Sequence, residues 1–347
     1  MSENWHVEKR AGRGIVGDMN FWHGKKVFIP GGGGFIGSHL VEQLLSLGAK
    51  VIVPKRPDRP AYPNIAHILD HIRLLPLDLG NESGVAKALD GMDVVLYLAT
   101  YTGGVLFSST RHAVMAYENL RPFMSTLEGA RKAGVRRFLV VSSACVYSDD
   151  APSPTPEEAG FEGMPQRSNE GYGMAKRMQE YLGMRYTAER ALPCPIVRLF
   201  NVYGPRGHFD PESAMVIPSL IRRITGAGKE LEVWGSGKAV RPFLFVDDCV
   251  TGIIAAAEHG PAGEPINLAA QEGTSIRELT ELALQLMDRS DLAIRFDTTK
   301  PEGQLKRLAD IRRAKNLLGF KPSIPLKEGL ERTIRWFLNE KAAGRLE

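Results

Sequence analysis

The chain has 347 residues, of which 43% are apolar and 24% charged, and its formal net charge is +4 at pH 7. This composition excludes a disordered or collagen-like chain, and the lack of a Lys/Arg block argues against a nucleic-acid partner. Cys145, Cys194 and Cys249 fit neither a disulfide framework nor a zinc site, so we expect a cytoplasmic protein without a metal.

Residues 1–24 carry charged residues and Trp but no hydrophobic stretch, which predicts an N-terminal extension rather than a secretory signal. No apolar run reaches the ~18 residues that a membrane helix needs, so no membrane partner is expected.

Strand-like and helix-like segments then alternate. The strands are apolar at almost every position, which is typical of a sheet covered by helices on both faces. The alternation predicts an α/β fold with a Rossmann-type doubly wound parallel sheet. The predicted strands are Lys26–Pro30, Val51–Val53, Arg73–Leu77, Val94–Ala99, Phe138–Ser142 and Ile196–Phe200, and the helices are Gly37–Leu47, Leu120–Ala133 and Tyr172–Glu189.

The rhythm changes after Tyr203. A strand at Phe243–Val246 and a helix at Asp247–Glu258 look like a return to the first part. We therefore predict two interleaved domains with a ligand cleft between them: a Rossmann domain of residues 25–203 plus 243–269, and a smaller α/β substrate domain of residues 204–242 plus 270–347. Helices of the second domain are predicted at Val216–Thr225, Ser275–Asp288 and Leu326–Asn339.

A glycine loop follows the first strand. Gly31, Gly34 and Gly37 have the spacing GxxGxxG and lead into a helix. Glycine lets the backbone approach a pyrophosphate closely, and the helix N-terminus offers N–H groups to its oxygens. The loop predicts a dinucleotide site that includes Phe35 and Ile36.

The end of the second strand bears on the choice of dinucleotide. NAD usually meets an acidic residue ~20 residues after the glycine loop. Lys55 and Arg56 stand there instead, which favours the 2′-phosphate of NADP over NAD, although both could be solvated loop charges. Later strand ends are predicted to line the cofactor through Asp78, Leu79, Leu98, Ala99 and Thr100.

Candidate catalytic residues follow the fifth strand. Tyr172 and Lys176 are four residues apart and share one face of a helix. A neighbouring cation lowers the pKa of a phenol, which suits proton transfer. If the chain stays extended after the strand, Ser143 and Cys145 point to one side and face the same substrate.

Together these motifs resemble the extended short-chain dehydrogenase/reductase family over residues 25–340. The segments Arg198–Pro205 (RLFNVYGP) and Arg241–Asp248 (RPFLFVDD) carry the resemblance as well. It implies an NAD(P)-dependent enzyme acting on a nucleotide sugar, with Ser143, Tyr172 and Lys176 as the catalytic triad. Tyr172 and Lys176 would also contact the cofactor, and the family suggests a homodimer.

Within the family, several segments are similar to those of GDP-fucose synthases and GDP-mannose 3,5-epimerases. In those enzymes the residue at the position of Cys145 removes a C–H proton next to a ketone; the alternative for Cys145 is a buried packing thiol. Met215 replaces their opposing acid, with His208 and Glu212 as nearby substitutes. The segments are Thr102–Gly104, Ser143–Cys145, Val216–Pro218, Val233–Gly237 and Lys300–Gly303.

The resemblance also implies contacts to the substrate. Arg241 and the pair Lys306 and Arg307 would bind phosphate or remain solvated charges, and Trp234 would stack on a base or fill the core. A GDP-sugar is favoured, and reduction of a 4-ketone and epimerisation both stay open. The alternatives are a UDP- or dTDP-sugar 4-epimerase with tightly bound NAD and a non-catalytic NADP sensor. The remaining implied substrate residues are Gly103, Gly104, Ser143, Asn201 and Val216.

Overall fold

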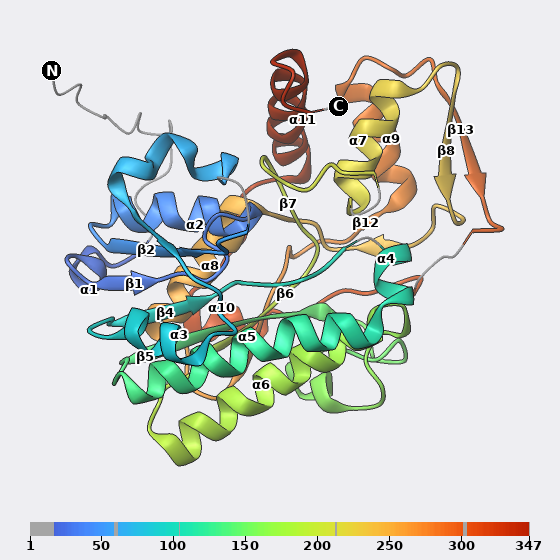
Figure 1. The fold of residues 1–347 in the computed structure, drawn as a ribbon. Coiled ribbons are helices and arrows are strands. Elements are labelled where there is room, and N and C mark those ends of the chain that lie inside the picture. Colours follow the sequence, from blue (N-terminus) through green and yellow to red (C-terminus); the bar gives the residue numbers. More distant parts are fainter. Residues whose placement is uncertain (1–16, 59–61, 104, 212–213, 301–303, 347) are drawn as a thin grey trace, which may run out of the picture.

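A seven-stranded parallel sheet forms the centre of the molecule (Figure 1). The computed structural model describes residues 17–58, 62–103, 105–211, 214–300 and 304–346. The strand order is β11-β6-β5-β4-β1-β2-β3, which confirms the predicted Rossmann-type doubly wound sheet. The strands are β1 (Lys26–Phe28), β2 (Lys50–Lys55), β3 (Arg73–Pro76), β4 (Val94–Tyr97), β5 (Arg137–Ser143), β6 (Ile196–Leu199) and β11 (Pro265–Leu268).

Helices cover both faces of this sheet. Successive strand residues point to opposite sides, so Val27 packs with one helical layer and Phe28 with the other. One layer contains α2 (Phe35–Ser46), the 3-10 helix η1 (Pro63–His71), α8 (Val246–His259) and α10 (Arg312–Leu318). The other contains α3 (Glu82–Leu89), α5 (His112–Lys132) and α6 (Glu170–Arg190).

A second apolar core belongs to the C-terminal part of the chain, at the upper right of Figure 1. It contains the helices α7 (Val216–Gly226), α9 (Ile276–Leu286) and α11 (Leu326–Ala342) and the parallel pair β8 (Glu230–Trp234) and β13 (Ala293–Asp297). Phe35 and Ile36, at the start of α2, pack against this second core. The glycine loop therefore lies where the two parts of the molecule meet.

Short elements join the two parts. β7 (Val202–Tyr203) pairs in parallel with β10 (Leu244–Phe245), and β9 (Val240–Arg241) pairs antiparallel with β12 (Thr274–Ser275). The remaining helical turns are α1 (Met19–Trp22), α4 (Val105–Thr110), η2 (Ala144–Val146), η3 (Glu157–Phe161) and η4 (Arg167–Asn169).

Two helices differ from what the sequence predicts. α5 begins at His112 rather than Leu120 and continues through Pro122, because packing against α3 and α6 outweighs the hydrogen bond that proline removes. α10 lies within residues 270–347, which were assigned to the substrate domain, yet it packs on α8 and β11. Ala314 of α10 belongs to the core of the Rossmann part, so the chain comes back to that part a second time, after α8 and β11.

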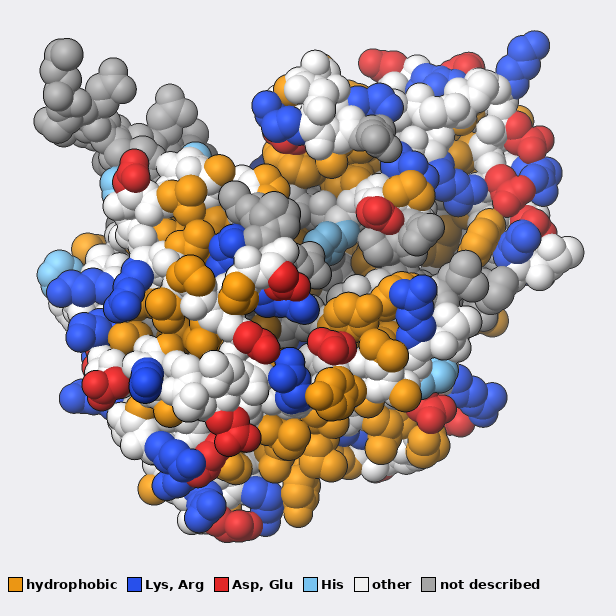
Figure 2. Space-filling model, in the orientation of Figure 1, with side chains coloured by type: hydrophobic (Ala, Val, Ile, Leu, Met, Phe, Trp, Pro, Cys, Tyr) orange, Lys and Arg blue, Asp and Glu red, His pale blue; other side chains and the backbone are white. Residues whose placement is uncertain are grey.

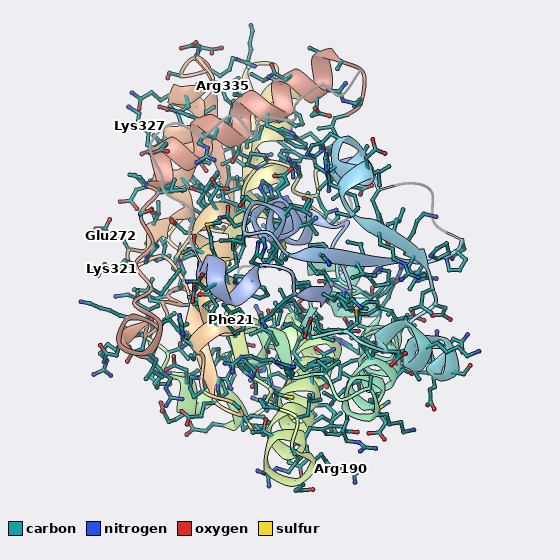
Figure 3. All side chains as sticks on the ribbon, turned by 90° about the vertical axis from the view of Figure 1, so that its left-hand side faces the viewer. Phe21, Arg190, Glu272, Lys321, Lys327 and Arg335 are labelled. Atoms are coloured by element: carbon teal, nitrogen blue, oxygen red, sulfur yellow. The ribbon has the colours of Figure 1, made fainter. Side chains whose placement is uncertain are left out.

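Figure 3 views the molecule from the side of α1, on which Phe21 lies. Trp22, the next residue, is fully buried, and its indole N–H donates to Glu258 of α8. This contact attaches the described end of the predicted extension to the Rossmann part. Among the described residues, no helix has the length and apolar character required to cross a bilayer.

Tyr97 provides a test of the sheet core. Its hydroxyl is buried beside Phe123 and Phe138 and has no hydrogen-bond partner within the described residues. Because an unsatisfied buried hydroxyl is unfavourable, Tyr97→Phe should raise the free energy of unfolding by ~1 kcal/mol, measured by urea denaturation. Tyr147→Phe is the matched control and should lower it, because that hydroxyl bonds Asn267 at 2.5 Å and Arg198 at 2.8 Å. Destabilisation by Tyr97→Phe would contradict this account.

Candidate active site

The loop between β1 and α2 is packed so closely that a side chain at Gly31 or Gly37 would collide with the backbone. A Cβ at Gly31 would lie 2.7 Å from backbone atoms of Leu98 and Ala99, which follow β4, and one at Gly37 would lie 2.1 Å from the Gly31 oxygen. No side chain caps α2 at Gly34, so the N–H groups of its first turn remain for an anion. The strand order reverses between β1 and β4, where such folds bind dinucleotides. The glycine loop therefore fits a dinucleotide.

Cations gather at the carboxyl ends of β2 and β3. Lys55 ends β2, and the exposed Arg56 pairs with Asp58 at 3.1 Å. Asp78 accepts from the Gly80 N–H at 2.9 Å and lies 3.5 Å from Arg121, which α5 contributes. Arg121 was not predicted, because nothing in its local sequence shows that α5 would bring it to this edge. Leu79 is half-buried beside the core of this face.

Ser143 and Cys145 lie together, but not for the reason the sequence suggested. The extended chain expected after β5 is wrong: the strand ends at Ser143 and the chain turns into η2. The turn places the Cys145 N–H 3.2 Å from the Ser143 hydroxyl oxygen, and the thiol hydrogen-bonds to Ser143 as well. A tight turn, rather than the alternation of a strand, thus brings the two side chains to one place.

Helix α6 brings Tyr172 and Lys176 to the same place. The Tyr172 phenol faces the hydroxyls of Ser143 and Thr100, which favour its ionised form and partly oppose the effect of burial on its pKa. The Lys176 Nζ lies 5.7 Å from the centre of the Tyr172 ring and donates to the Val141 carbonyl of β5 at 2.9 Å. The structure thus gathers all four residues expected to be catalytic at the carboxyl end of β5.

Burial governs the electrostatics of this cluster. It lowers the pKa of Lys176 to about 8, against the attraction of Glu180, and it raises the pKa of the Tyr172 phenol. Burial also raises the pKa of the Cys145 thiol, which the Ser143 hydrogen bond and the positive charges of Arg307 and Lys176 partly oppose. Lys176 is therefore a cation at neutral pH, while the phenol and the thiol hold their protons.

A buried polar network behind the cluster escaped sequence analysis. Arg198 of β6 and Glu180 of α6 are fully buried and form a bidentate ion pair, with the closer contact at 2.7 Å. Glu180 also accepts from Ser142, and Arg198 donates to Tyr147. The sequence shows Arg198 only as part of a motif, because a charge on a strand gives no sign of a partner on a distant helix.

The side expected to face the substrate is mostly exposed. Lys306 is exposed, whereas Arg307 is buried and donates to Gln304 at 2.7 Å. Trp234 is 51% exposed, with Lys300 5.6 Å from its ring centre, which excludes the core-filling role. Half-buried Arg241 donates to the Val240 carbonyl, and exposed Asn201 has a φ of 40°, which asparagine tolerates.

The loop before α7 holds the other expected residues. Met215 and Val216 are 59% and 39% exposed, and His208 is exposed as well. Gly103 is half-buried after β4, with Phe107 next to its Cα. Gly104 and Glu212 lie outside the described residues.

Figure 2 shows the surface hollowed where the Rossmann part meets the C-terminal part. Within the described chain, no group of three or more His, Cys, Asp and Glu side chains could hold a metal ion.

Comparison with known proteins identifies the family. The model of the NAD dependent epimerase/dehydratase family matches residues 27–269. A dTDP-4-dehydro-6-deoxy-D-allose reductase of Streptomyces bikiniensis is 34% identical over 91% of this chain and 97% of its own length. GDP-mannose 3,5-epimerase 1 of Oryza sativa subsp. japonica is 31% identical over 91% of this chain and 83% of its own.

Solved structures agree with the fold. UDP-glucose 4-epimerase of Thermotoga maritima, with UDP-glucose, has a TM-score of 0.81 and 27% identity over 91% of this chain and 99% of its own. A dTDP-glucose 4,6-dehydratase of Streptomyces venezuelae, with NAD bound, has a TM-score of 0.80 and 26% identity over 92% and 98%. The chain therefore belongs to the NAD dependent epimerase/dehydratase family and is an NAD(P)-dependent sugar-nucleotide epimerase or reductase.

Proposed function

We propose that this enzyme reduces a 4-keto group of a nucleotide-activated hexose, with Cys145 exchanging a proton at C3 or C5 of the sugar. One observation carries the proposal: Ser143, Cys145, Tyr172 and Lys176 meet at the carboxyl end of β5, next to the glycine loop of the dinucleotide site. The intact cluster also argues against a non-catalytic NADP sensor.

Tyr172 is the proton donor to the sugar oxygen. Ser143 faces the phenol and is positioned to hold the same oxygen. The Lys176 ammonium, 5.7 Å from the centre of the Tyr172 ring, would stabilise the phenolate that forms when the proton leaves. The nicotinamide cofactor supplies the hydride when bound. The same groups in reverse would oxidise a C4 hydroxyl.

Cys145 is the candidate base for a neighbouring C–H bond. A ketone at C4 makes the protons at C3 and C5 acidic. Burial raises the pKa of the Cys145 thiol, so it holds its proton at rest, and the charges of Arg307 and Lys176 partly oppose this effect and support the thiolate that a base requires. A complete epimerisation also needs an acid on the opposite sugar face. Met215, at the position of that acid, carries no transferable proton and is exposed. The residues that reduction requires are therefore all present, whereas epimerisation lacks its opposing acid at this position.

Residues of the C-terminal part offer contacts to the nucleotide of the substrate. Exposed Trp234 offers a ring for base stacking, and Arg241 and Lys306 offer positive charge for a diphosphate. Val240, the residue before Arg241, pairs with Lys306, so the two cations belong to neighbouring segments. A GDP-sugar is our first choice because GDP-sugar enzymes recur among the relatives, and a dTDP-sugar is the second.

The function is tested with GDP- and dTDP-linked 4-keto-6-deoxyhexoses and NADPH in D₂O, following NADPH absorbance and deuterium at C3 and C5 by NMR. We expect turnover of one of them, with kcat reduced ~100-fold or more in Tyr172→Phe because the proton donor is lost. Cys145→Ser should suppress deuterium incorporation and spare reduction. Unchanged activity in Tyr172→Phe would refute the mechanism. Wild-type turnover without exchange would limit the reaction to reduction and refute the role of Cys145, whereas NAD that co-purifies and survives dialysis would favour the 4-epimerase alternative.

We propose NADP as the preferred cofactor. Lys55 and Arg56 at the end of β2, with Arg121 nearby on α5, supply cations beside the expected adenosine ribose, where Asp58 pairs with Arg56 and Asp78 with Arg121. A guanidinium binds phosphate oxygens in pairs, which suits a 2′-phosphate.

Replacing Lys55 and Arg56 together by Ser should weaken NADPH binding ~10-fold or more and leave NADH binding nearly unchanged, because only NADPH carries the 2′-phosphate. Fluorescence titration of both cofactors measures this. Arg73→Ser, at the opposite end of the neighbouring strand β3, is the control and should change neither affinity. Tighter binding of NADH by the wild type would refute the preference.

We further propose a homodimer through α5 and α6. Exposed hydrophobic side chains gather over these two helices in the lower half of Figure 2. On α5 they are Val114, Tyr117 and Met124, with exposures of 49%, 59% and 48%, and on α6 they are Met174, Met178 and Tyr181, with 44%, 44% and 50%. A contiguous apolar face of this kind on a water-exposed helix pair marks a protein interface.

Met178→Glu should shift the enzyme toward monomers, because it buries a charge in that interface. Light scattering after size exclusion measures the mass. Leu338→Glu on α11, where the wild-type side chain is 43% exposed against 44% for Met178, is the control and should leave the mass unchanged. A monomeric wild type would rule out the dimer.

A further inference from the structure

Gln179 occupies a fully buried position one helical turn after Lys176. Its side-chain carbonyl accepts from the Lys176 ammonium at 3.0 Å. Its amide N–H donates to the main-chain carbonyl of Asn119 on α5 at 2.9 Å. Both ends of the amide are thus bonded: its oxygen holds the lysine that lies beside Tyr172, and its N–H joins α6 to α5.

Asn119 extends this connection to the cofactor side. Its carboxamide oxygen accepts from the Thr100 hydroxyl at 3.1 Å and from the Tyr101 N–H at 2.9 Å, both in the segment after β4. Thr100 in turn faces the Tyr172 phenol. Gln179 therefore bonds the residue, Asn119, whose side chain holds Thr100 beside that phenol.

Other groups near Lys176 cannot take over this contact. Glu180 faces it from α6, but both carboxylate oxygens are engaged by Arg198 and Ser142. Cys145 faces it from η2 with a thiol whose pKa burial raises, and β5 offers the Val141 carbonyl. Tyr172 presents its ring. Gln179 is consequently the side chain that accepts a hydrogen bond from the ammonium.

We propose that Gln179 is a positioning residue for Lys176, holding its ammonium between β5 and α5 at the distance from Tyr172 that proton transfer requires. The inference rests on the proposed function, in which Lys176 stabilises the phenolate. It adds a consequence: without this acceptor the charged form of Lys176 is less favourable, so its pKa falls below the value of about 8 that burial gives it.

The test compares Gln179→Met, which keeps the shape and removes the acceptor, with Gln179→Glu, which keeps an acceptor. In NADPH-dependent reduction of the 4-keto sugar turned over above, Gln179→Met should lower kcat and move the alkaline limb of its pH profile to lower pH by about one unit. Gln179→Glu should place that limb at or above the wild-type position. Thr126→Val is the control, since it removes a buried α5 hydrogen bond to Pro122 that lies outside the chain of bonds to Lys176.

A second readout does not depend on activity. Lys176 is charged in the fold below about pH 8 and neutral above it. The destabilisation by Gln179→Met, measured by urea denaturation, should therefore be larger at pH 6 than at pH 9, whereas that by Thr126→Val should be the same at both. A pH-independent effect of Gln179→Met, or an alkaline limb of Gln179→Glu below that of the wild type, would overturn the proposal.

Lys176→Met, assayed alongside, separates the two proposals. Loss of activity in Lys176→Met together with a wild-type pH profile in Gln179→Met refutes the positioning role alone. Retained activity in Lys176→Met refutes the proposed function and the positioning role with it.

Discussion

The buried ion pair between Arg198 and Glu180 fixes the geometry on which the site depends. It ties β6 to α6 at a point where neither side chain meets water. Breaking such a pair leaves an unpaired buried charge, which is far less favourable than keeping both partners, so α6 has one position against the sheet. Tyr172 and Lys176 lie on that helix, and Ser142, bonded to Glu180, precedes Ser143.

The cluster that results balances burial against charge. Burial alone would neutralise Lys176 and hold the protons on the phenol and the thiol. Glu180 opposes the first effect, and the hydroxyls of Ser143 and Thr100 oppose the second. Small changes in this surrounding shell therefore alter proton transfer without touching a reacting group.

The C-terminal part of the chain holds the site from the other side. Arg307 and Gln304 bind the loop after η2, at Asp149, and so connect the substrate side to the turn that carries Cys145. Farther along α2, Glu42 pairs with Arg206 at 2.6 Å, which joins the two parts of the molecule beyond the glycine loop.

The sequence by itself determined what depends on local spacing. The alternation of apolar strands with helices predicted the doubly wound sheet. Two motifs were also readable, namely GxxGxxG after β1 and the four-residue spacing of Tyr172 and Lys176, because residues on one turn or on one helix face must lie together. Tertiary structure decided what joins distant segments. The Ser143–Cys145 turn, the Gln179–Asn119 bridge, the partner of Arg198 and the exposure of Trp234 all depend on which elements pack together, and pairwise contacts across a core leave no periodic trace along the chain.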